Sequence, residues 1–432
     1  MSTLSDLINK HCPDGVEYKT LSDVTTSINI GVNPRKFFKL NPDDATGFYV
    51  TVRELNGISG VMQYDNTDKI NDAAITLIQN RANISVGDIL FSNTGTVGKL
   101  ALVVDYNNTW AVNEGIYIIK PTNIVLSKFL YYLLESDLTK NQINKKLTGS
   151  TLKHITQSAL SDIKIPIPPI EVQCEIVRIL DNFAELTAEL TAELTARKQQ
   201  YKYYRDELLK PKANIPMVTL AEIATDIYRG SGIKRDQVTE DGIPCVRYGE
   251  IYTTYNTWFT DCVSHTQLEF VPNPKYFEHG DILFAITGES VEDIAKSVVY
   301  VGHEKCLAGG DIVVLKHKQN PRYLAHVLAT KEARDQKSKG KVKSKVVHSN
   351  VPSIEKIVIP LPSLDVQERY ANVLDNFEAI CNDLNIGLPA EIEARKTQYE
   401  FYRDMLLTFA ETSMVEADRQ TDRQTDRQTD RR

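Results

Sequence analysis

The chain has 432 residues, 25% of them charged, and a formal net charge of −7 at pH 7. This length predicts two or three domains, and the composition excludes a fibrous or low-complexity chain. No apolar run is long enough to span a bilayer, the first residues lack a secretory signal pattern, and six scattered cysteines form no CxxC pair. We therefore expect a cytoplasmic protein with reduced thiols and no membrane contact.

Residues 1–165 are predicted to form a first mixed α/β domain. The domain opens with YKTLSDV at 18–24 and continues with a buried-strand phrase, GDILFSNTG, at 87–95. A β-rich run starting at Gly115 and one helix near 127–145 follow. The domain closes with a basic loop and a strand that runs into the proline-rich IPIPP, where no helix can continue.

A central helical spacer is predicted over 166–212, with one long helix at 171–209. Its apolar residues recur in steps of three and four, which is a heptad seam with one extra four-residue step. The seam consists of Val172, Ile176, Ile179, Phe183, Leu186, Leu190, Leu194, Tyr201, Tyr204 and Leu208.

A tandem tetrapeptide, TAEL-TAEL, occupies residues 187–194 of this helix. Ala, Glu and Leu all favour helix, and four residues add about 6 Å to its length. One interpretation is a ruler whose length changes in whole units. The alternative is a duplication by replication slippage that a helix simply tolerates.

The second part of the chain repeats this plan about 194 residues later. Residues 213–359 predict a second α/β domain with MVTLAEI, GDILFAITG and a helix near 321–337, and residues 360–410 predict a distal helical spacer. The phrase IPIPPIEVQCEIVRILDNF is echoed by IPLPSLDVQERYANVLDNF, and ARKQQYKYYRDELL by ARKTQYEFYRDMLL. Gly387 and Pro389 are expected to kink or split the second helix. Its seam would consist of Val366, Tyr370, Val373, Phe377, Ile380, Leu384, Leu388, Ile392, Arg395, Tyr399, Tyr402 and Leu406.

Two near-copies of one seam predict that the two helices bury their seams against each other as an antiparallel pair. The alternative is two ordinary amphipathic helices on separate cores. The segments 171–210 and 365–409 carry net charges of −2 and −5, which together account for the −7. The remaining surfaces are balanced, so the overall charge does not exclude a nucleic-acid partner. The tail, 411–432, consists largely of DRQT repeats without apolar residues and is expected to be disordered.

These features together resemble the specificity subunit of a type I restriction-modification enzyme. The resemblance rests on the two variable domains, the repeated IPxP…VQ…LDNF…RK.QY..YRD.LL helices and the TAEL units. The TAEL units and the YYRD and FYRD endings most resemble the C-type branch. The resemblance implies two pseudo-symmetric target-recognition domains of mixed α/β fold, joined by two long antiparallel coiled-coil helices.

The resemblance also implies a function without catalysis in this chain. Each domain would read one half of a bipartite site on double-stranded DNA, while the helices set the spacer and dock two modification subunits. Those methyltransferase subunits would carry S-adenosylmethionine, and motor-nuclease restriction subunits would use ATP and Mg. No cofactor is expected on this chain itself.

A search for catalytic motifs supports this expectation. No phosphate-binding loop, dinucleotide fingerprint, HExxH, GxSxG or adenine-methyltransferase motif occurs, and the eight histidines have no metal-ligand spacing. We therefore predict no catalytic and no metal-binding residue. Two alternatives stay open: a stand-alone sequence-specific DNA-binding regulator, and a coiled-coil scaffold without a nucleic-acid role.

DNA contacts are expected from polar and basic loops. Lysine at every second position from 337 to 345 would place five ammonium groups on one face of an extended segment, where they could follow phosphates. The alternative is a solvated lysine-rich loop. The row consists of Lys337, Lys339, Lys341, Lys343 and Lys345, with His348 beyond. Its counterpart in the first domain consists of Lys145, Lys146, Ser150, Lys153 and His154.

Further candidates were chosen because Arg and Asn can read base edges through paired hydrogen bonds. Thr94 and Thr287 belong to the TG phrases, for which a structural turn is the alternative. The candidates of the first domain are Arg53, Asn93, Thr94 and Lys99. Those of the second are Arg229, Lys234, Arg235, Arg247, Tyr248 and Thr287.

Overall fold

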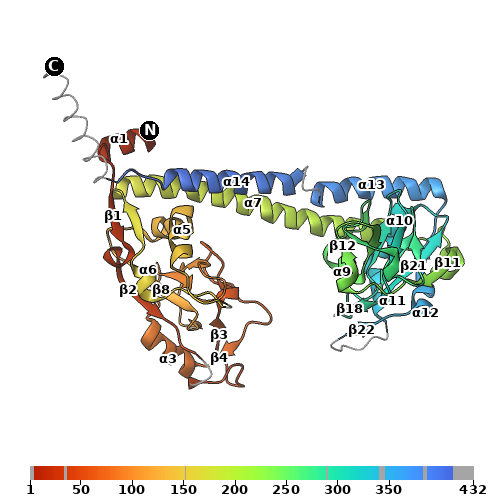
Figure 1. Ribbon diagram of the computed structural model, residues 1–432, viewed down its shortest axis with the longest axis horizontal. Helices are drawn as coiled ribbons and strands as arrows, with labels where there is room; N and C mark the ends of the chain where they lie inside the picture. Colours follow the sequence, from red (N-terminus) through yellow and green to blue (C-terminus); the bar gives the residue numbers. More distant parts are fainter. Residues whose placement is uncertain are drawn as a thin grey trace, which may run out of the picture. The chain divides into compact units, whose positions relative to one another are not determined.

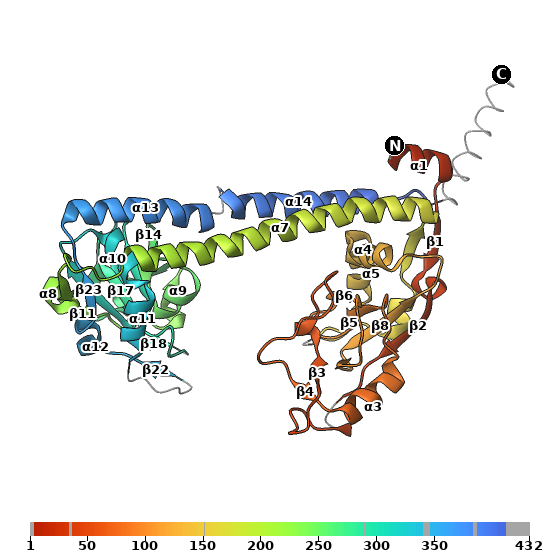
Figure 2. The same cartoon turned by 180° about the vertical axis from the view of Figure 1, so that it is seen from behind.

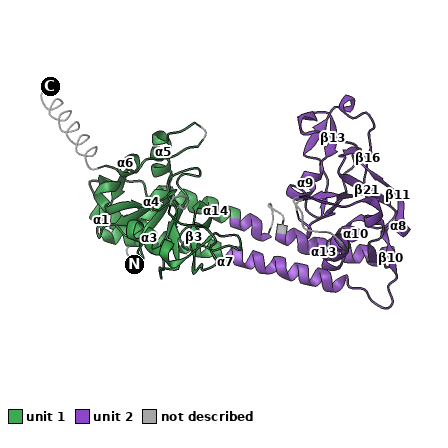
Figure 3. Ribbon diagram, turned by 90° about the horizontal axis from the view of Figure 1, so that it is seen from below, with its two compact units in different colours: residues 1–189, 393–432 green, residues 190–392 purple. Residues whose placement is uncertain are grey.

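The computed structural model describes residues 4–33, 37–150, 152–288, 290–339, 346–382 and 387–411. The chain divides into two compact units, residues 1–189 with 393–432 and residues 190–392 (Figure 3). Each unit thus combines a globular domain with parts of the helical segments. In the described part of the chain, no helix is long and apolar enough to cross a membrane. The DRQT repeats lie outside the described residues.

The core of unit 1 is organised by a four-stranded antiparallel sheet with the order β2 (Thr25–Ile30), β8 (Ile116–Pro121), β5 (Ile89–Ser92) and β6 (Leu100–Leu102). Successive side chains of a strand point to opposite faces. Ile89 and Phe91 therefore join a core with helix α4 (Ser127–Glu135), and Leu90 joins a second core on the other face. That second face is covered by α3 (Asp72–Ala82) and by strands β4 (Lys69–Ile70), β3 (Gly47–Val50) and β7 (Trp110–Val112).

Unit 2 repeats this design. Its sheet has the order β11 (Ala224–Arg229), β21 (Ile312–His317), β17 (Ile282–Ala285), β19 (Ser297–Tyr300) and β14 (Trp258–Phe259). Ile282 and Phe284 face the core with helix α10 (Pro321–Leu328), whereas Leu283 and Ala285 face the opposite core. The second sheet has the order β12 (Val238–Thr239), β15 (Ser264–Thr266), β13 (Ile243–Val246), β20 (Cys306–Ala308) and β16 (Tyr276–Phe277). The two GDILF phrases are therefore equivalent central strands.

The proline-rich exits pair with the strands that open each domain. Strand β9 (Lys164–Ile167) lies antiparallel to β1 (Glu17–Thr20), and β23 (Val358–Pro360) lies antiparallel to β10 (Met217–Thr219). In unit 1 the backbone N–H of Val16 also donates to the carbonyl of Ala410 at 2.9 Å. The start and the end of each domain thus lie side by side.

The long helix α7 (Ile170–Leu208) is continuous, as predicted. The distal region is split into α13 (Leu364–Asn382) and α14 (Gly387–Leu406), and Gly387 has a left-handed φ of 69°. The left-handed backbone of Gly387 confirms the kink expected there, and residues 383–386 lie outside the described part of the chain. Figures 1 and 2 show α7 alongside α14 in unit 1, where the rings of Phe183 and Tyr402 stack at 5.4 Å.

The seam prediction is wrong at part of α13 and α7. Val373, Phe377 and Ile380 are 49%, 42% and 49% exposed, and Leu186 is exposed as well. The physical reason is that α13 turns another face inward. Its buried residues join the core around α10 instead of forming a dry seam along α7, and they include Ala371, Leu374 and Cys381.

The single helices predicted at 127–145 and 321–337 are each two helices. Unit 1 has α4 and α5 (Asp137–Lys146), and unit 2 has α10 and α11 (Lys331–Ser338). At each break a buried hydroxyl donates a hydrogen bond to the preceding helical turn: Ser136 Oγ to Leu133 O in unit 1, and Thr330 Oγ1 to Val327 O in unit 2. Such side-chain bonds compete with helix continuation.

Residues repeated in the two helical segments attach each globular domain to the helices. Buried Gln173 accepts a hydrogen bond from the backbone of Leu126, and buried Gln367 accepts one from Asn320. Asp404 accepts from the backbone N–H of Asp137 and so caps the start of α5. Asp206 caps α11 through Lys331 in the same way. The repeated residues Gln173 and Gln367, and Asp404 and Asp206, therefore make equivalent attachments between the helices and the two domains.

Candidate nucleic-acid interface

The TG phrases and the two predicted histidines come together in both domains. Thr94 forms an antiparallel bridge with His154, and Thr287 forms the equivalent pair with His348. Thr287 Oγ1 lies 3.2 Å from His348 Nδ1. In the first domain, the histidine contacts Thr148 instead, with 2.9 Å between Oγ1 and Nε2. The TG phrase thus pairs with the segment that carries the histidine and joins the central sheet to the basic loop, as an isolated bridge at Thr94 in the first domain and as strand β18 (Thr287–Gly288) in the second.

The basic loop of the first domain carries exposed side chains. Lys145 lies in the last turn of helix α5 and is exposed, as are Ser150 and Lys153 further along. The backbone carbonyl of Lys153 accepts from the N–H of Gly95 at 2.9 Å, which holds this loop beside the TG turn. Lys146 lies 3.8 Å from Asp162 and is half-buried. Four of the five residues of this predicted set, which are Lys145, Ser150, Lys153 and His154, are therefore exposed.

The second lysine row does not begin where it was predicted. Lys337 belongs to helix α11, is only 5% exposed, and donates from Nζ to Ser297 Oγ at 3.0 Å and to Leu328 O at 2.9 Å. An extended exposed row cannot include a buried helical residue. Lys339 is exposed at the end of the helix, while Lys341, Lys343 and Lys345 lie outside the described residues.

Arg53 and Lys99 of the first domain are brought together beside strand β3. Lys99 Nζ donates to the backbone carbonyl of Arg53 at 3.2 Å. The guanidinium of Arg53 is held by Glu54, whose carboxylate is completely buried and also accepts from Thr51 and Thr67. Burial alone raises the pKa of Glu54, but these hydrogen bonds outweigh it, and the net pKa is lowered.

Asn93 is buried, with an exposed fraction of 5%. Its amide donates to Glu114 O at 3.0 Å, and its carbonyl oxygen accepts from Thr94 Oγ1 at 2.6 Å. Its donor and acceptor are both used inside the domain. The structure therefore gives Asn93 a role inside the domain, where its buried amide links the TG phrase to the backbone of Glu114.

Three candidates of the second domain line one cleft of about 670 Å³. Arg235, Arg247 and Tyr248 contribute side chains to it, and Lys234 is the exposed neighbour of Arg235. Arg229 lies next to the cleft, because its guanidinium donates to Gly310 O and pairs with Asp311, 2.7 Å away. The remaining residues that line the cleft are Gly232, Ile233, Gly249, Glu250, Thr253, Gly309, Gly310 and Asp311.

Sequence reasoning missed the buried glutamates behind Arg53 and Arg247. Glu54 and Glu250 follow equivalent strands, and each caps the short helical turn there by accepting from a backbone N–H, of Thr51 and Arg247 respectively. The available signal was a glutamate three residues after the first residue that follows each strand, which is the spacing of a capping box.

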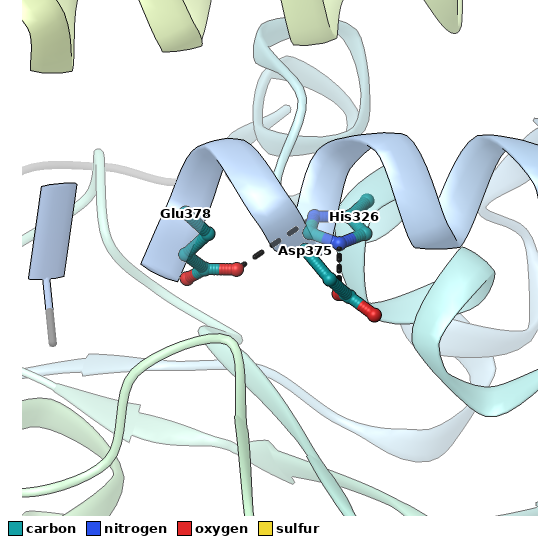
Figure 4. A group of neighbouring side chains, drawn as sticks. All are labelled: His326, Asp375 and Glu378. Atoms are coloured by element: carbon teal, nitrogen blue, oxygen red, sulfur yellow. Dashed lines mark hydrogen bonds and ion pairs between the residues drawn. The ribbon is translucent and has the colours of Figure 1, made fainter. Parts of the chain in front are cut away.

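A separate cluster of His326, Asp375 and Glu378 lies between α10 and α13 (Figure 4). The potential ligand atoms of these three side chains lie within 4.8 Å of one another. Asp375 Oδ1 lies 2.7 Å from His326 Nε2, and Tyr201 Oη lies 3.0 Å from Nδ1. Burial raises the pKa of Asp375, but hydrogen bonds from His326 and Arg322 outweigh it and leave a lowered pKa.

The equivalent junction of unit 1 explains this cluster. There Tyr132 donates to Asp181 Oδ1 at 2.7 Å, and Lys128 pairs with Oδ2 at 2.6 Å. Asp181 and Asp375 are the aspartates of the two LDNF phrases. Asp181 accepts from side chains of α4, and Asp375 accepts from side chains of α10. Both ring nitrogens of His326 are engaged. The cluster therefore serves to join the second domain to helix α13.

The comparisons with known proteins agree with this architecture. Residues 13–197 and 215–394 each match the type I restriction modification DNA specificity domain. A putative type I restriction enzyme specificity subunit of Haemophilus influenzae is 27% identical over 91% of this chain and 96% of its own length. The EcoR124I/EcoR124II specificity subunit of Escherichia coli is 30% identical over 68% of this chain and 73% of its own length.

A solved chain from a study of complex assembly and conformational transition in a type I restriction-modification system has the same fold. Its TM-score is 0.60 at 17% identity, with 91% of this chain and 97% of that chain covered. Two copies of the family's domain account for most of the sequence. The chain belongs to the type I restriction-modification specificity subunits.

Proposed function

We propose that this chain is the non-catalytic subunit that gives a type I restriction-modification complex its DNA sequence specificity. Each globular domain reads one half of a bipartite site on double-stranded DNA. The observation that carries the proposal is the duplicated scaffold. Two domains share central strands and helix junctions, yet the groups at equivalent surface positions differ: Thr51 corresponds to Arg247 at the first position after equivalent strands, and Arg53 corresponds to Gly249. A constant frame with two different surfaces suits two different half-sites.

The long helices provide the spacer in this proposal. Helix α7 has 39 residues, which corresponds to about 58 Å at 1.5 Å per residue. Half-sites read from one face of the duplex lie near one helical turn apart, roughly 34 Å. The helix is therefore long enough to bridge two half-sites. The TAEL units lie in a largely exposed part of α7, where a change in length disturbs few contacts.

The exposed stripe of α13 supports docking of modification subunits. Val373, Phe377 and Ile380 follow the spacing of one helix face and leave apolar surface in contact with water. Contiguous exposed apolar surface of this kind typically marks a protein interface. The partner subunits would bring S-adenosylmethionine and adenine methylation. Motor-nuclease subunits, with ATP and Mg, would join the same complex.

Methylome sequencing tests the proposal. A host without other adenine methylation would express this chain together with its modification subunit. The expected result is a new split motif with methylated adenines, which gives both half-sites and the spacer. If the complex assembles and no new motif appears, the proposal fails, and specific DNA binding without the partner would then favour a stand-alone regulator.

A further inference from the structure

In the cleft of the second domain, the buried carboxylate of Glu250 fixes the orientation of the Arg247 side chain. Glu250 is 7% exposed and lies behind Arg247. Arg247 Nε donates to Glu250 Oε1 at 2.9 Å, and Nη2 lies 2.9 Å from the same oxygen. Ser264 Oγ donates to Oε1 at 2.8 Å, and the backbone N–H of Arg247 donates to Oε2 at 3.0 Å. Both carboxylate oxygens are therefore held in place.

This contact uses only one edge of the planar guanidinium. An arginine has five N–H donors in a fixed fork, and the pair with Glu250 engages the edge formed by Nε and Nη2. The second edge, formed by Nη1 and Nη2, necessarily faces away from the carboxylate and still carries two parallel donors. Within the described part of the chain, the guanidinium makes no other hydrogen bond. Arg247 itself lines the cleft.

We propose that Arg247 reads a guanine of the second half-site from the major groove and that Glu250 is the positioning residue that fixes its guanidinium. This inference rests on the proposed function. Guanine presents two acceptors, O6 and N7, which match two parallel donors, whereas adenine presents an acceptor and a donor. A guanidinium already oriented by a buried carboxylate loses less side-chain freedom on binding, which favours the matched base.

The first domain shows why the assignment is made for Arg247 and not for Arg53. Arg53 Nε donates to Glu54 Oε1 at 2.8 Å, and Nη2 lies 2.7 Å from that oxygen. Nη2 also donates to Asn66 O at 3.0 Å. Both hydrogens of this nitrogen are thus engaged, and the paired edge is no longer free. Arg53 can offer only Nη1, which suits a single acceptor such as a phosphate oxygen.

Two glycines leave open space on the wall of the cleft. Gly232 and Gly249 line it, and a Cβ added at either position would meet no atom within 4 Å. Gly249 lies in helix α9 (Tyr248–Thr253), where a larger residue is favoured over glycine by about 1 kcal/mol in propensity. A side chain there would fill the cleft without disturbing the core, which provides a perturbation that spares the fold.

The first experiment pairs protein variants with modified DNA. The complex of this chain with its modification subunits is titrated onto duplexes in which each guanine of the second half-site is replaced, one at a time, by 7-deazaguanine. We expect one position to weaken binding roughly tenfold to a hundredfold, since a bidentate contact is lost there. With Arg247→Ala, the same replacement should have no effect. Replacement by inosine, which keeps O6 and N7, serves as the matched DNA control.

The second experiment separates positioning from folding. Glu250→Gln should lose most of the discrimination against 7-deazaguanine at that one position while binding to other sequences is kept, a position-specific change that a lowered Tm from the lost buried carboxylate does not by itself produce. Gly249→Leu should abolish specific binding to the second half-site without lowering the Tm. Arg235→Gln, on the same cleft, is the control that should weaken binding to all sequences and reduce the salt dependence.

The outcomes distinguish this inference from the proposed function. If the complex methylates a split motif and Arg247→Ala keeps full sensitivity to every 7-deazaguanine, the guanine assignment is overturned and the specificity function stands. An unaltered affinity of Gly249→Leu also overturns it, because the cleft would then not hold DNA. If the parent complex prefers no sequence at all, the proposed function itself fails.

Discussion

Lys337 offers a sharp test because two different roles predict opposite behaviour. Its Nζ is buried and bonded to Ser297 and Leu328, and it lies 5.6 Å from the ring centre of Phe284. Burial, with a smaller contribution from the charge of Arg334, lowers the pKa of the Lys337 ammonium from its ordinary 10.5 to about 7. A residue in this setting affects stability with pH rather than the attraction of phosphates.

The number of protons bound to Lys337 in the folded and unfolded chain decides whether the unfolding free energy rises or falls with pH. Between pH 7 and 10.5 the unfolded chain holds a proton on Lys337 and the folded chain does not, so stability rises with pH in this window. The gain in unfolding free energy is complete above pH 10.5, and it is lost as the pH falls to about 7. At about 1.4 kcal/mol for each unit of pKa shift, the full effect is on the order of 5 kcal/mol.

The assay is urea unfolding of the chain and of Lys337→Met at several pH values from 7 to 10. We expect the difference in unfolding free energy between the two to change by about 1 kcal/mol per pH unit. The change of this difference with pH reports only the ionisation of Lys337. The two lost hydrogen bonds add a contribution that is the same at every pH. Lys339→Met is the exposed control. A difference that stays constant with pH would refute the reasoning.

The other predictions concern the helices and the exposed lysine. A third TAEL unit after residues 187–194 should add about 6 Å to α7 and lengthen the DNA spacer by one or two base pairs. An unchanged methylation motif would contradict the ruler. Phe377→Ser should reduce co-purification of the modification subunit without lowering the Tm. Asp181→Ala should destabilise unit 1 by about 1–2 kcal/mol in denaturant unfolding, because it leaves the buried Tyr132 hydroxyl unpaired, while the half-exposed Lys128 loses little. Lys339→Gln should lower the salt slope of DNA binding by about one, and Lys337→Met should leave that slope unchanged.

Local chemistry was enough to predict the parts of the fold that depend on neighbours in sequence. The GDILF phrases form central strands because continuous apolar runs suit a strand with both faces buried. The helix from Ile170 to Leu208 follows from its composition and its lack of glycine and proline. The kink at Gly387 follows from the left-handed backbone that this glycine adopts.

The positions of side chains on those elements depended on the tertiary structure. The heptad spacing identified an apolar stripe on α13, but a competing face of the same helix packs on α10, so that Phe377 is exposed and Leu374 is buried. The regular spacing of the lysines likewise described a row, and helix α11 turned its first member into the core. The spacing of residues in a sequence shows which faces a helix has. It does not show which of these faces packs against another part of the domain.

The duplicated plan, the family and the long helices could all be inferred before the fold was known, since they rest on repeated phrases and local helix propensity. The folded domain was needed to bring Ser264 to Glu250 and Thr287 to His348, which are 14 and 61 residues apart in the chain. The physical reason is that a hydrogen bond needs atoms within about 3 Å in a defined direction. Such geometry is set by the packing of a whole domain, and no spacing in the sequence encodes it.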